Sequence, residues 1–320
     1  MENTASAASD FQHSKPFFFE VSLAAWSFAG ELMSGKMTNM DFPARAKNDC
    51  NIDVVEYVST FFNDRHTDAA YLKELKQRCD DLGVQSNLIM VDGANIADLN
   101  PVKREEAVAA HRAWVDAAKY LGCRSIRVNL GDVGKILTSE PDDPAEEAAA
   151  AATDGYHQLL QYAATENINV VVENHFGNST DVDWLVGVVK AVNMPNAGLL
   201  PDFGNFCFQR TKPETNDWQG VMKTKCLKMF DRYEGVKKMM PYAKGVSAKS
   251  HRFDENGNDI GTDYFRMFNI IREFDINGYV GIEYAGSFGK LFDPGSKDLE
   301  GTEGVLATKK LLARVKKELT

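Results

Sequence analysis

The sequence has 320 residues, of which 44% are hydrophobic and 26% are charged. That composition is typical of a folded globular protein, and the length fits one large α/β barrel. Lysines and arginines number 36 and aspartates and glutamates 46, so the formal net charge is −10. Because an acidic chain repels phosphate backbones, we expect no nucleic-acid partner.

Five cysteines stand at positions 50, 79, 123, 207 and 226, and no two form a CxxC pair. Dispersed cysteines of odd number in a chain of this length predict free thiols in a reducing compartment, with neither a disulfide framework nor a zinc knuckle. No apolar run approaches the roughly 20 residues of a membrane span, and the first residues do not resemble a secretory signal. We therefore expect a cytoplasmic protein with no membrane partner, in which residues 1–16 form a disordered tail.

From residue 17 onward, short apolar runs alternate with longer segments of helical periodicity. The runs predict eight strands, over residues 17–26, 53–60, 84–91, 123–131, 168–175, 197–206, 244–251 and 279–286. Between two of them, apolar side chains recur every three or four positions at Leu72, Leu75, Cys79 and Leu82. This spacing is typical of an amphipathic helix that covers a sheet.

Eight strand–helix units with strands that are apolar nearly throughout predict a closed parallel barrel, because such strands are buried on both faces. Gly83, Gly122 and Gly278 precede predicted strands, where a glycine commonly ends the previous helix. A doubly wound open sheet would alternate similarly, but it usually has a GxGxxG turn after its first strand, and SLAAWSFAG has none. We therefore predict a single (β/α)8 TIM barrel over residues 17–320.

Acidic residues end three predicted strands, at the face where barrel enzymes have their active sites. They are Glu173 in VVVENH, Asp202 in LLPDFGN and Glu283 in YVGIEY. A single carboxylate at a strand end is commonly a helix N-cap. These three should be buried, however, and a buried carboxylate requires a cation or a basic partner. Their convergence indicates a divalent metal, and oxygen ligands favour Mn²⁺ or Mg²⁺ over Zn²⁺ or copper.

His175 stands two residues after Glu173, so both side chains should point to the barrel mouth. It is either a general base or acid, or a histidine that only hydrogen-bonds its neighbours. Lys249, near the end of the seventh strand, either pairs with a carboxylate or stabilises a developing oxyanion. An apolar wall for a sugar face, or ordinary core packing, is expected of Trp26, Phe61 and Phe62.

The chain from Phe17 onward resembles the xylose isomerase-like TIM barrels, also labelled sugar phosphate isomerase/epimerase or AP endonuclease family 2. The resemblance is carried by VEYVSTFF, VVVENHFGNST, LLPDFGNF, PYAKGVSAKSHRFDENG and GYVGIEYAG. It implies a metal held by Glu, Asp, His and Glu from strands five to eight. The histidine position holds Ser247, so either His251 reaches in as fourth ligand or Ser247 leaves room for a water or a substrate oxygen. Asn205 replaces the second histidine of many relatives, and both departures count against a DNA repair enzyme.

The resemblance implies an enzyme that abstracts a proton next to a carbonyl of a sugar, keto-sugar or cyclic polyol. The products of isomerisation or epimerisation would arise through a metal-stabilised enediolate. Mn²⁺ is the expected metal, with Mg²⁺, Co²⁺ or Zn²⁺ as alternatives. Catalysis is assigned to Glu173, His175, Lys249 and Glu283. Substrate binding is assigned to Asn205, Ser247 and Trp26. The metal is assigned to Glu173, Asp202, His251 and Glu283.

Two alternatives stay open. One is a lyase or hydratase that acts by β-elimination on 3-keto-glycosides, including C-glycosides, for which Ser247 would widen the site. The other is a non-catalytic barrel that binds a sugar or a partner protein, motivated by the missing fourth ligand. Against it stands the cost of keeping buried carboxylates without a cation. The resemblance also implies a homo-oligomer, and a partner subunit if the lyase reading holds.

Overall fold

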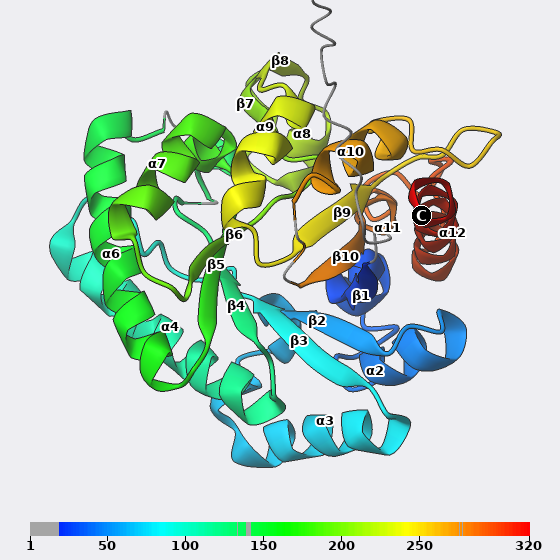
Figure 1. The fold of residues 1–320 in the computed structure, drawn as a ribbon, viewed down its shortest axis with the longest axis horizontal. Coiled ribbons are helices and arrows are strands. Elements are labelled where there is room, and N and C mark those ends of the chain that lie inside the picture. Colours follow the sequence, from blue (N-terminus) through cyan, green and yellow to red (C-terminus); the bar gives the residue numbers. More distant parts are fainter. Residues whose placement is uncertain (1–18, 133, 139–141, 275, 277) are drawn as a thin grey trace, which may run out of the picture.

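The computed structural model describes residues 19–132, 134–138, 142–274, 276 and 278–320, so the predicted tail lies outside the described residues. Eight parallel strands form one sheet in the order β6–β5–β4–β3–β2–β1–β10–β9. Isolated parallel bridges from Leu199 to Ala243 and from Asp202 to Ser247 join the two edges. The helices surround the sheet (Figure 1), and the predicted (β/α)8 barrel is confirmed.

Each barrel strand lies inside one of the eight predicted runs. The strands are β1 (Glu20–Ala24), β2 (Val54–Val58), β3 (Gln85–Met90), β4 (Ser125–Val128), β5 (Asn169–Glu173), β6 (Ala197–Leu200), β9 (Val246–Ser250) and β10 (Tyr279–Tyr284). Every residue of β4 and of β10 is buried. Burial on both faces is what a parallel barrel imposes, since one face meets the interior and the other meets the helices.

The helices cover the outside of the barrel and form short turns at its mouth. They are α1 (Ala29–Met33), α2 (Phe42–Ala44), α3 (Ala69–Leu82), α4 (Pro101–Leu121), α5 (Lys135–Thr138), α6 (Ala145–Thr165), α7 (Val182–Val192), α8 (Trp218–Met222), α9 (Arg232–Met239), α10 (Tyr264–Ile271), α11 (Gly286–Gly289) and α12 (Gly301–Leu319). Single turns of 3-10 helix are η1 (Ala25–Phe28), η3 (Ser59–Phe62), η4 (Arg65–Thr67), η5 (Gly177–Thr180) and η6 (Met240–Tyr242), and η2 (Arg45–Asp49) is a π-helix. In the described residues, no helix has the length and apolarity of a membrane span.

Two of the three predicted glycine stops are confirmed. Gly83 ends α3 and Gly122 ends α4, each in the left-handed conformation, with φ of 65° and 82°. The prediction for Gly278 was wrong, because α10 already ends at Ile271. A Cβ at Gly278 would lie 2.1 Å from the backbone oxygen of Lys244, so this glycine permits close approach of two chain segments.

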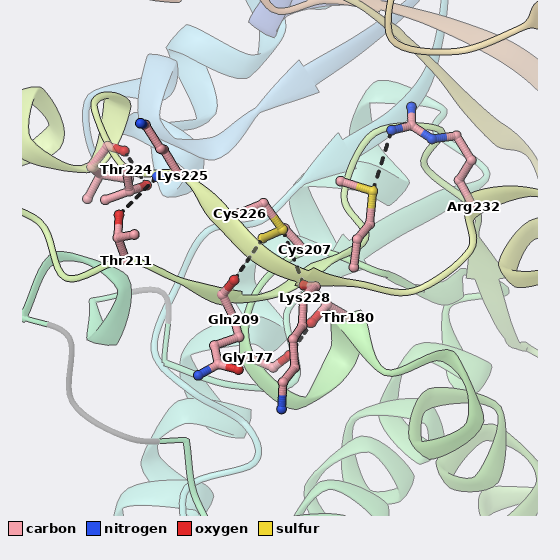
Figure 2. Close-up of a disulfide and its surroundings, with 12 residues drawn as sticks. Gly177, Thr180, Cys207, Gln209, Thr211, Thr224, Lys225, Cys226, Lys228 and Arg232 are labelled. Carbon is pink, nitrogen blue, oxygen red and sulfur yellow. Dashed lines mark hydrogen bonds between the residues drawn. A yellow bond between two sulfur atoms is a disulfide. The ribbon is translucent and has the colours of Figure 1, made fainter.

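Between β6 and β9 the chain leaves the barrel and forms an unpredicted antiparallel hairpin of β7 (Cys207–Arg210) and β8 (Cys226–Met229). The hairpin brings Cys207 and Cys226 to a Cα–Cα distance of 5.9 Å, and a disulfide joins them (Figure 2). The prediction of free thiols was therefore wrong for this pair, because a separation of 19 residues does not reveal strand pairing. It was right for Cys50, Cys79 and Cys123, which are free and buried.

Candidate active site

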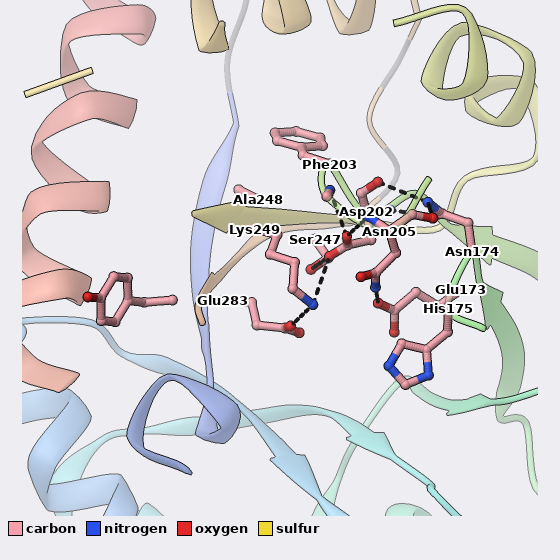
Figure 3. A network of polar contacts seen from close by, with 12 residues as sticks. Glu173, Asn174, His175, Asp202, Phe203, Asn205, Ser247, Ala248, Lys249 and Glu283 are labelled. Carbon is pink, nitrogen blue, oxygen red and sulfur yellow. Dashed lines mark hydrogen bonds and ion pairs between the residues drawn. The ribbon is translucent and has the colours of Figure 1, made fainter. Parts of the chain in front are cut away.

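Three acidic side chains meet at the mouth of the barrel, as the sequence predicts. Glu173 ends β5, Asp202 lies two residues beyond β6, and Glu283 belongs to β10. Each offers a carboxylate oxygen within 4.8 Å of the others. The residues are only 1%, 0% and 4% exposed. Figure 3 shows the three carboxylates arranged around Lys249. We call them the acidic triad.

Asp202 is held by donors on both of its oxygens. Ser247 donates its hydroxyl to Oδ2 at 2.8 Å, and the backbone N–H groups of Gly204 and Asn205 donate to Oδ1 at 2.8 and 2.9 Å. Asn174 then ties down the loop, since its side chain accepts from the backbone N–H of Asp202 and donates to two loop carbonyls. This carboxylate is thus fixed before any ligand arrives.

Glu173 has one satisfied oxygen and one that keeps acceptor capacity. Asn205 donates its amide to Oε1 at 3.0 Å. Oε2 lies 3.0 Å from Nε of Arg127 without the alignment of a hydrogen bond. Burial raises the pKa of Glu173 to about 8, although the Arg127 guanidinium opposes that shift. A buried oxygen with an unused lone pair is a ready ligand for a cation.

Lys249 forms the ion pair that was one of its two predicted roles. Its Nζ donates to Oε1 of Glu283 at 2.6 Å and lies 3.9 Å from Oδ2 of Asp202. Burial disfavours the ammonium charge, but the surrounding carboxylates outweigh burial and hold the pKa of Lys249 above its ordinary value. The side chain is therefore a cation with one of its three N–H donors on Glu283.

The sequence reasoning missed three further residues beside the triad, namely Asp92, Arg127 and Asn129. Arg127 of β4 is 3% exposed and donates to Asp92 at 2.6 Å while pairing with Glu173. Asn129 donates its amide to the same oxygen of Asp92 at 2.9 Å. A signal was present in CRSIRVNLG, where two polar residues alternate at the end of an apolar strand.

Asn129 also sets the state of His175. Because its amide nitrogen donates to Asp92, its Oδ1 faces Nδ1 of His175 at 3.0 Å and accepts a hydrogen bond from Nδ1–H. Burial and the Arg127 charge hold the pKa of His175 well below its ordinary value. This network assigns a neutral imidazole whose Nε2 is the proton acceptor.

Two predicted site residues stand apart from the acidic triad. The structure does not bring His251 to it, because β9 ends at Ser250 and the ring of His251 turns toward Asp298, with Nδ1 to Oδ1 at 3.9 Å. The His251 side chain is 43% exposed. Trp26 of η1 is half-buried, and its ring packs against Phe61 and Phe288 at 6.1 and 5.0 Å between centroids.

Core packing accounts for the two phenylalanines that were considered with Trp26. Phe61 and Phe62 are 5% and 0% exposed and belong to the buried core. That reading of them is confirmed. Trp26, by contrast, is half-buried.

The charge of the site suits a divalent cation. With every group ionised, the four carboxylates of the acidic triad and Asp92 and the two cations Arg127 and Lys249 leave a formal charge of −2. Burial of an uncompensated charge costs roughly several kcal/mol of folding free energy. Carboxylate oxygens are ligands that hard divalent ions prefer. The residues present therefore fit a metal ion bound by the triad.

The model for the family described as xylose isomerase-like TIM barrel matches residues 44–302. The chain belongs to this family. Its matched region contains the triad, Arg127, His175 and Lys249. No curated protein matches the chain in sequence.

Solved structures with the same barrel support this membership at the level of fold. A xylose isomerase-like TIM barrel protein from Mycobacterium smegmatis in complex with magnesium has a TM-score of 0.64 and 16% identity, covering 94% of this chain and 98% of that chain. D-psicose 3-epimerase in the presence of D-fructose has a TM-score of 0.64 and 13% identity, covering 92% of this chain and 99% of that chain. The probable 3-DHS dehydratase AsbF from Bacillus anthracis has a TM-score of 0.61 and 14% identity, covering 92% of this chain and 98% of that chain.

Proposed function

We propose that this barrel is a metal-dependent enzyme that abstracts a proton next to a carbonyl of a sugar, keto-sugar or cyclic polyol, giving isomerisation or epimerisation. The observation that carries the proposal is the juxtaposition of the buried acidic triad with a neutral histidine whose tautomer is set by Asn129. Proton abstraction requires a base that is unprotonated at neutral pH and a means to stabilise the resulting oxyanion, and these two features supply both.

Glu173, Asp202 and Glu283 would hold the metal, with Mn²⁺ expected first and Mg²⁺, Co²⁺ or Zn²⁺ as alternatives. When bound, such an ion supplies a Lewis acid that polarises a carbonyl oxygen. Support comes from the donor set and from the magnesium in one of the related structures. Ser247 and Asn205 orient two of the carboxylates toward this task by donating hydrogen bonds to them.

The remaining residues move or stabilise protons and charge. His175 accepts the substrate proton at Nε2, while Nδ1–H stays on Asn129. Lys249 has N–H donors beyond the one on Glu283, and we assign one to the developing oxyanion. Besides His175, Glu173 and Glu283 are further candidates for transferring the substrate proton. Trp26, which is half-buried, is assigned to a sugar face.

A second candidate function is β-elimination on 3-keto-glycosides. In that reaction the base removes the proton next to the carbonyl, the bond to the aglycone breaks, its electrons leave with the aglycone, and a carbon–carbon double bond forms. The observation that favours it is a cavity of about 450 Å³ lined by Phe176, whose ring contacts that of His175, and by the β7–β8 hairpin. A cavity of that size has room for a leaving group.

Elemental analysis by mass spectrometry tests the proposal on protein purified without chelators. We expect one equivalent of a divalent metal, and its loss in Glu173→Gln. Glu74→Gln, at an exposed glutamate on α3, is the matched control and should keep the metal. Deuterium exchange into keto-sugars from heavy water would then report proton abstraction. If metal is absent even after reconstitution, the enzymatic proposal fails and the sugar- or partner-binding barrel replaces it.

The expected homo-oligomer, the partner subunit and the cytoplasmic location stay predictions from the sequence and the resemblance. The Cys207–Cys226 disulfide runs against the reducing compartment on which the predicted location was based.

A further inference from the structure

Aromatic rings form a continuous series around and across the barrel mouth. Successive ring centroids are separated by 6.1 Å from Phe61 to Trp26, 5.0 Å from Trp26 to Phe288, 5.7 Å from Phe288 to Trp218 and 6.4 Å from Trp218 to Phe176. These spacings lie within or close to the range of attractive aromatic contact. We call the five residues the aromatic arc.

The arc connects two sides of the barrel. Its first three rings come from the turns that follow β2, β1 and β10, which are neighbours in the sheet. Phe176 follows β5, which lies three strands away from β10 if the barrel is followed through its closing bridges. Trp218, from α8 of the excursion that contains the hairpin, supplies the link between them. The arc therefore connects the loops after β10 and β5, two of the strands that carry the acidic triad.

One end of the arc meets the proposed base. The ring of Phe176 lies 4.0 Å from the ring of His175, centroid to centroid. Trp26, Phe176 and Trp218 are half-buried, so each keeps ring surface that a ligand can cover. An apolar surface that begins at the base and extends outward can bind the part of a substrate that lies next to the reacting carbon.

The cavity of about 450 Å³ continues this surface beyond Phe176. The β7–β8 hairpin closes its other side, with Phe208, Gln209 and Arg210 among the lining residues. Phe208 is 43% exposed, so part of this apolar side chain is open to a ligand. Acidic and basic side chains both line the cavity, namely Asp132, Asp142, Lys135, Arg210 and Lys212. Side chains of both charge signs do not single out a phosphate group as the occupant of this cavity.

We propose that the aromatic arc and this cavity form a subsite for an aryl group attached to the sugar-like substrate. The inference rests on the proposed function and deepens it by naming aryl glycosides as the substrate class. A planar aromatic ring fits offset or edge-to-face between the arc and Phe208, whereas an alkyl substituent would cover little of that surface.

Isothermal titration calorimetry with two matched probes tests the subsite on the full protein as purified. The probes are 4-nitrophenyl β-D-glucopyranoside and methyl β-D-glucopyranoside, which share the sugar and differ in the aryl group. Neither has a carbonyl, so binding is measured without turnover. We expect the aryl probe to bind about tenfold tighter, the equivalent of about 1.4 kcal/mol from aromatic contact.

Trp218→Ala should remove that preference, and so should Phe208→Ala, which alters only an exposed side chain of the hairpin. Tyr120→Ala, at an exposed tyrosine on α4, is the matched control and should leave it unchanged. Equal affinities for the two probes, no binding of either, or a preference that persists in both variants would overturn the subsite. A failure of the proposed function would be seen separately, as missing metal or missing deuterium exchange.

Discussion

The hydroxyl of Ser247 donates a hydrogen bond of 2.8 Å to Oδ2 of Asp202. Ser247 stands two residues before Lys249, where the resemblance to the family implies a histidine ligand. Asn205 departs from the family pattern in the same manner and donates to Glu173 at 3.0 Å. Each of the two residues that depart from the family pattern therefore donates a hydrogen bond to a carboxylate of the acidic triad.

Removal of the Ser247 hydroxyl should weaken metal binding. In Ser247→Ala, Oδ2 of Asp202 loses its donor, and loss of such orienting partners typically lowers metal affinity about 10-fold or more. Competition against a chromogenic chelator measures the affinity. Ser34→Ala, at an exposed serine, should change nothing. Unchanged affinity in Ser247→Ala would mean that this hydrogen bond does not serve the metal.

Loss of Arg127 should destabilise the protein strongly. Arg127→Met leaves Asp92 and Glu173 without their shared cation, and breaking a buried ion pair from one side costs about 3–5 kcal/mol. Denaturant unfolding measures the loss. Arg78→Met, which breaks the exposed pair with Glu74, should cost at most about 1 kcal/mol. Comparable losses in the two variants would show that the Arg127 pairs carry no special weight.

Asn129→Ala should slow proton abstraction without releasing the metal. The substitution removes the acceptor of Nδ1–H, so the tautomer and orientation of the His175 ring are no longer imposed. His175→Ala should lower the exchange rate by about 100-fold or more, and Asn129→Ala by less. Deuterium exchange and metal content are measured on the same samples. Loss of metal in either variant would instead make His175 a part of the metal site.

The stability of chelator-treated protein should fall as pH rises from about 6.5 to about 8. Burial raises the pKa of Glu173 above that of the unfolded chain, so within this window the folded state binds more protons. A state that binds more protons loses stability when pH rises. Below this window, His175 opposes the trend, because its lowered pKa means that the unfolded state takes up the proton.

Thermal unfolding at several pH values measures this dependence. Glu173→Gln should flatten it, since the amide does not titrate. Saturation with metal should reverse it, because protons compete with the ion for the carboxylates. If the melting temperature of the chelator-treated protein without substitutions rises with pH across this window, the raised pKa of Glu173 is contradicted.

The sequence alone determined the barrel and most of the acidic site. Apolar runs alternating with amphipathic segments leave few folds that bury both faces of the strands, and parallel strands bring their carboxyl ends to one rim. Glu173, Asp202 and Glu283 could therefore be placed together from their positions at strand ends. A carboxylate partner was one of the two predicted roles of Lys249, and the structure identifies that partner as Glu283, because β9 and β10 are adjacent and pair the two residues in register.

Tertiary structure decided the contacts that depend on loops and on side-chain reach. Asn129 meets His175 across 46 residues, and Cys207 meets Cys226 only because the excursion folds into a hairpin. His251 follows a strand end like the others, yet the chain turns after Ser250 and directs its ring to Asp298. The alternation of a strand predicts the direction in which a side chain points only for residues within that strand. Beyond the last strand residue, packing between loops from distant strands determines which side chains reach the site.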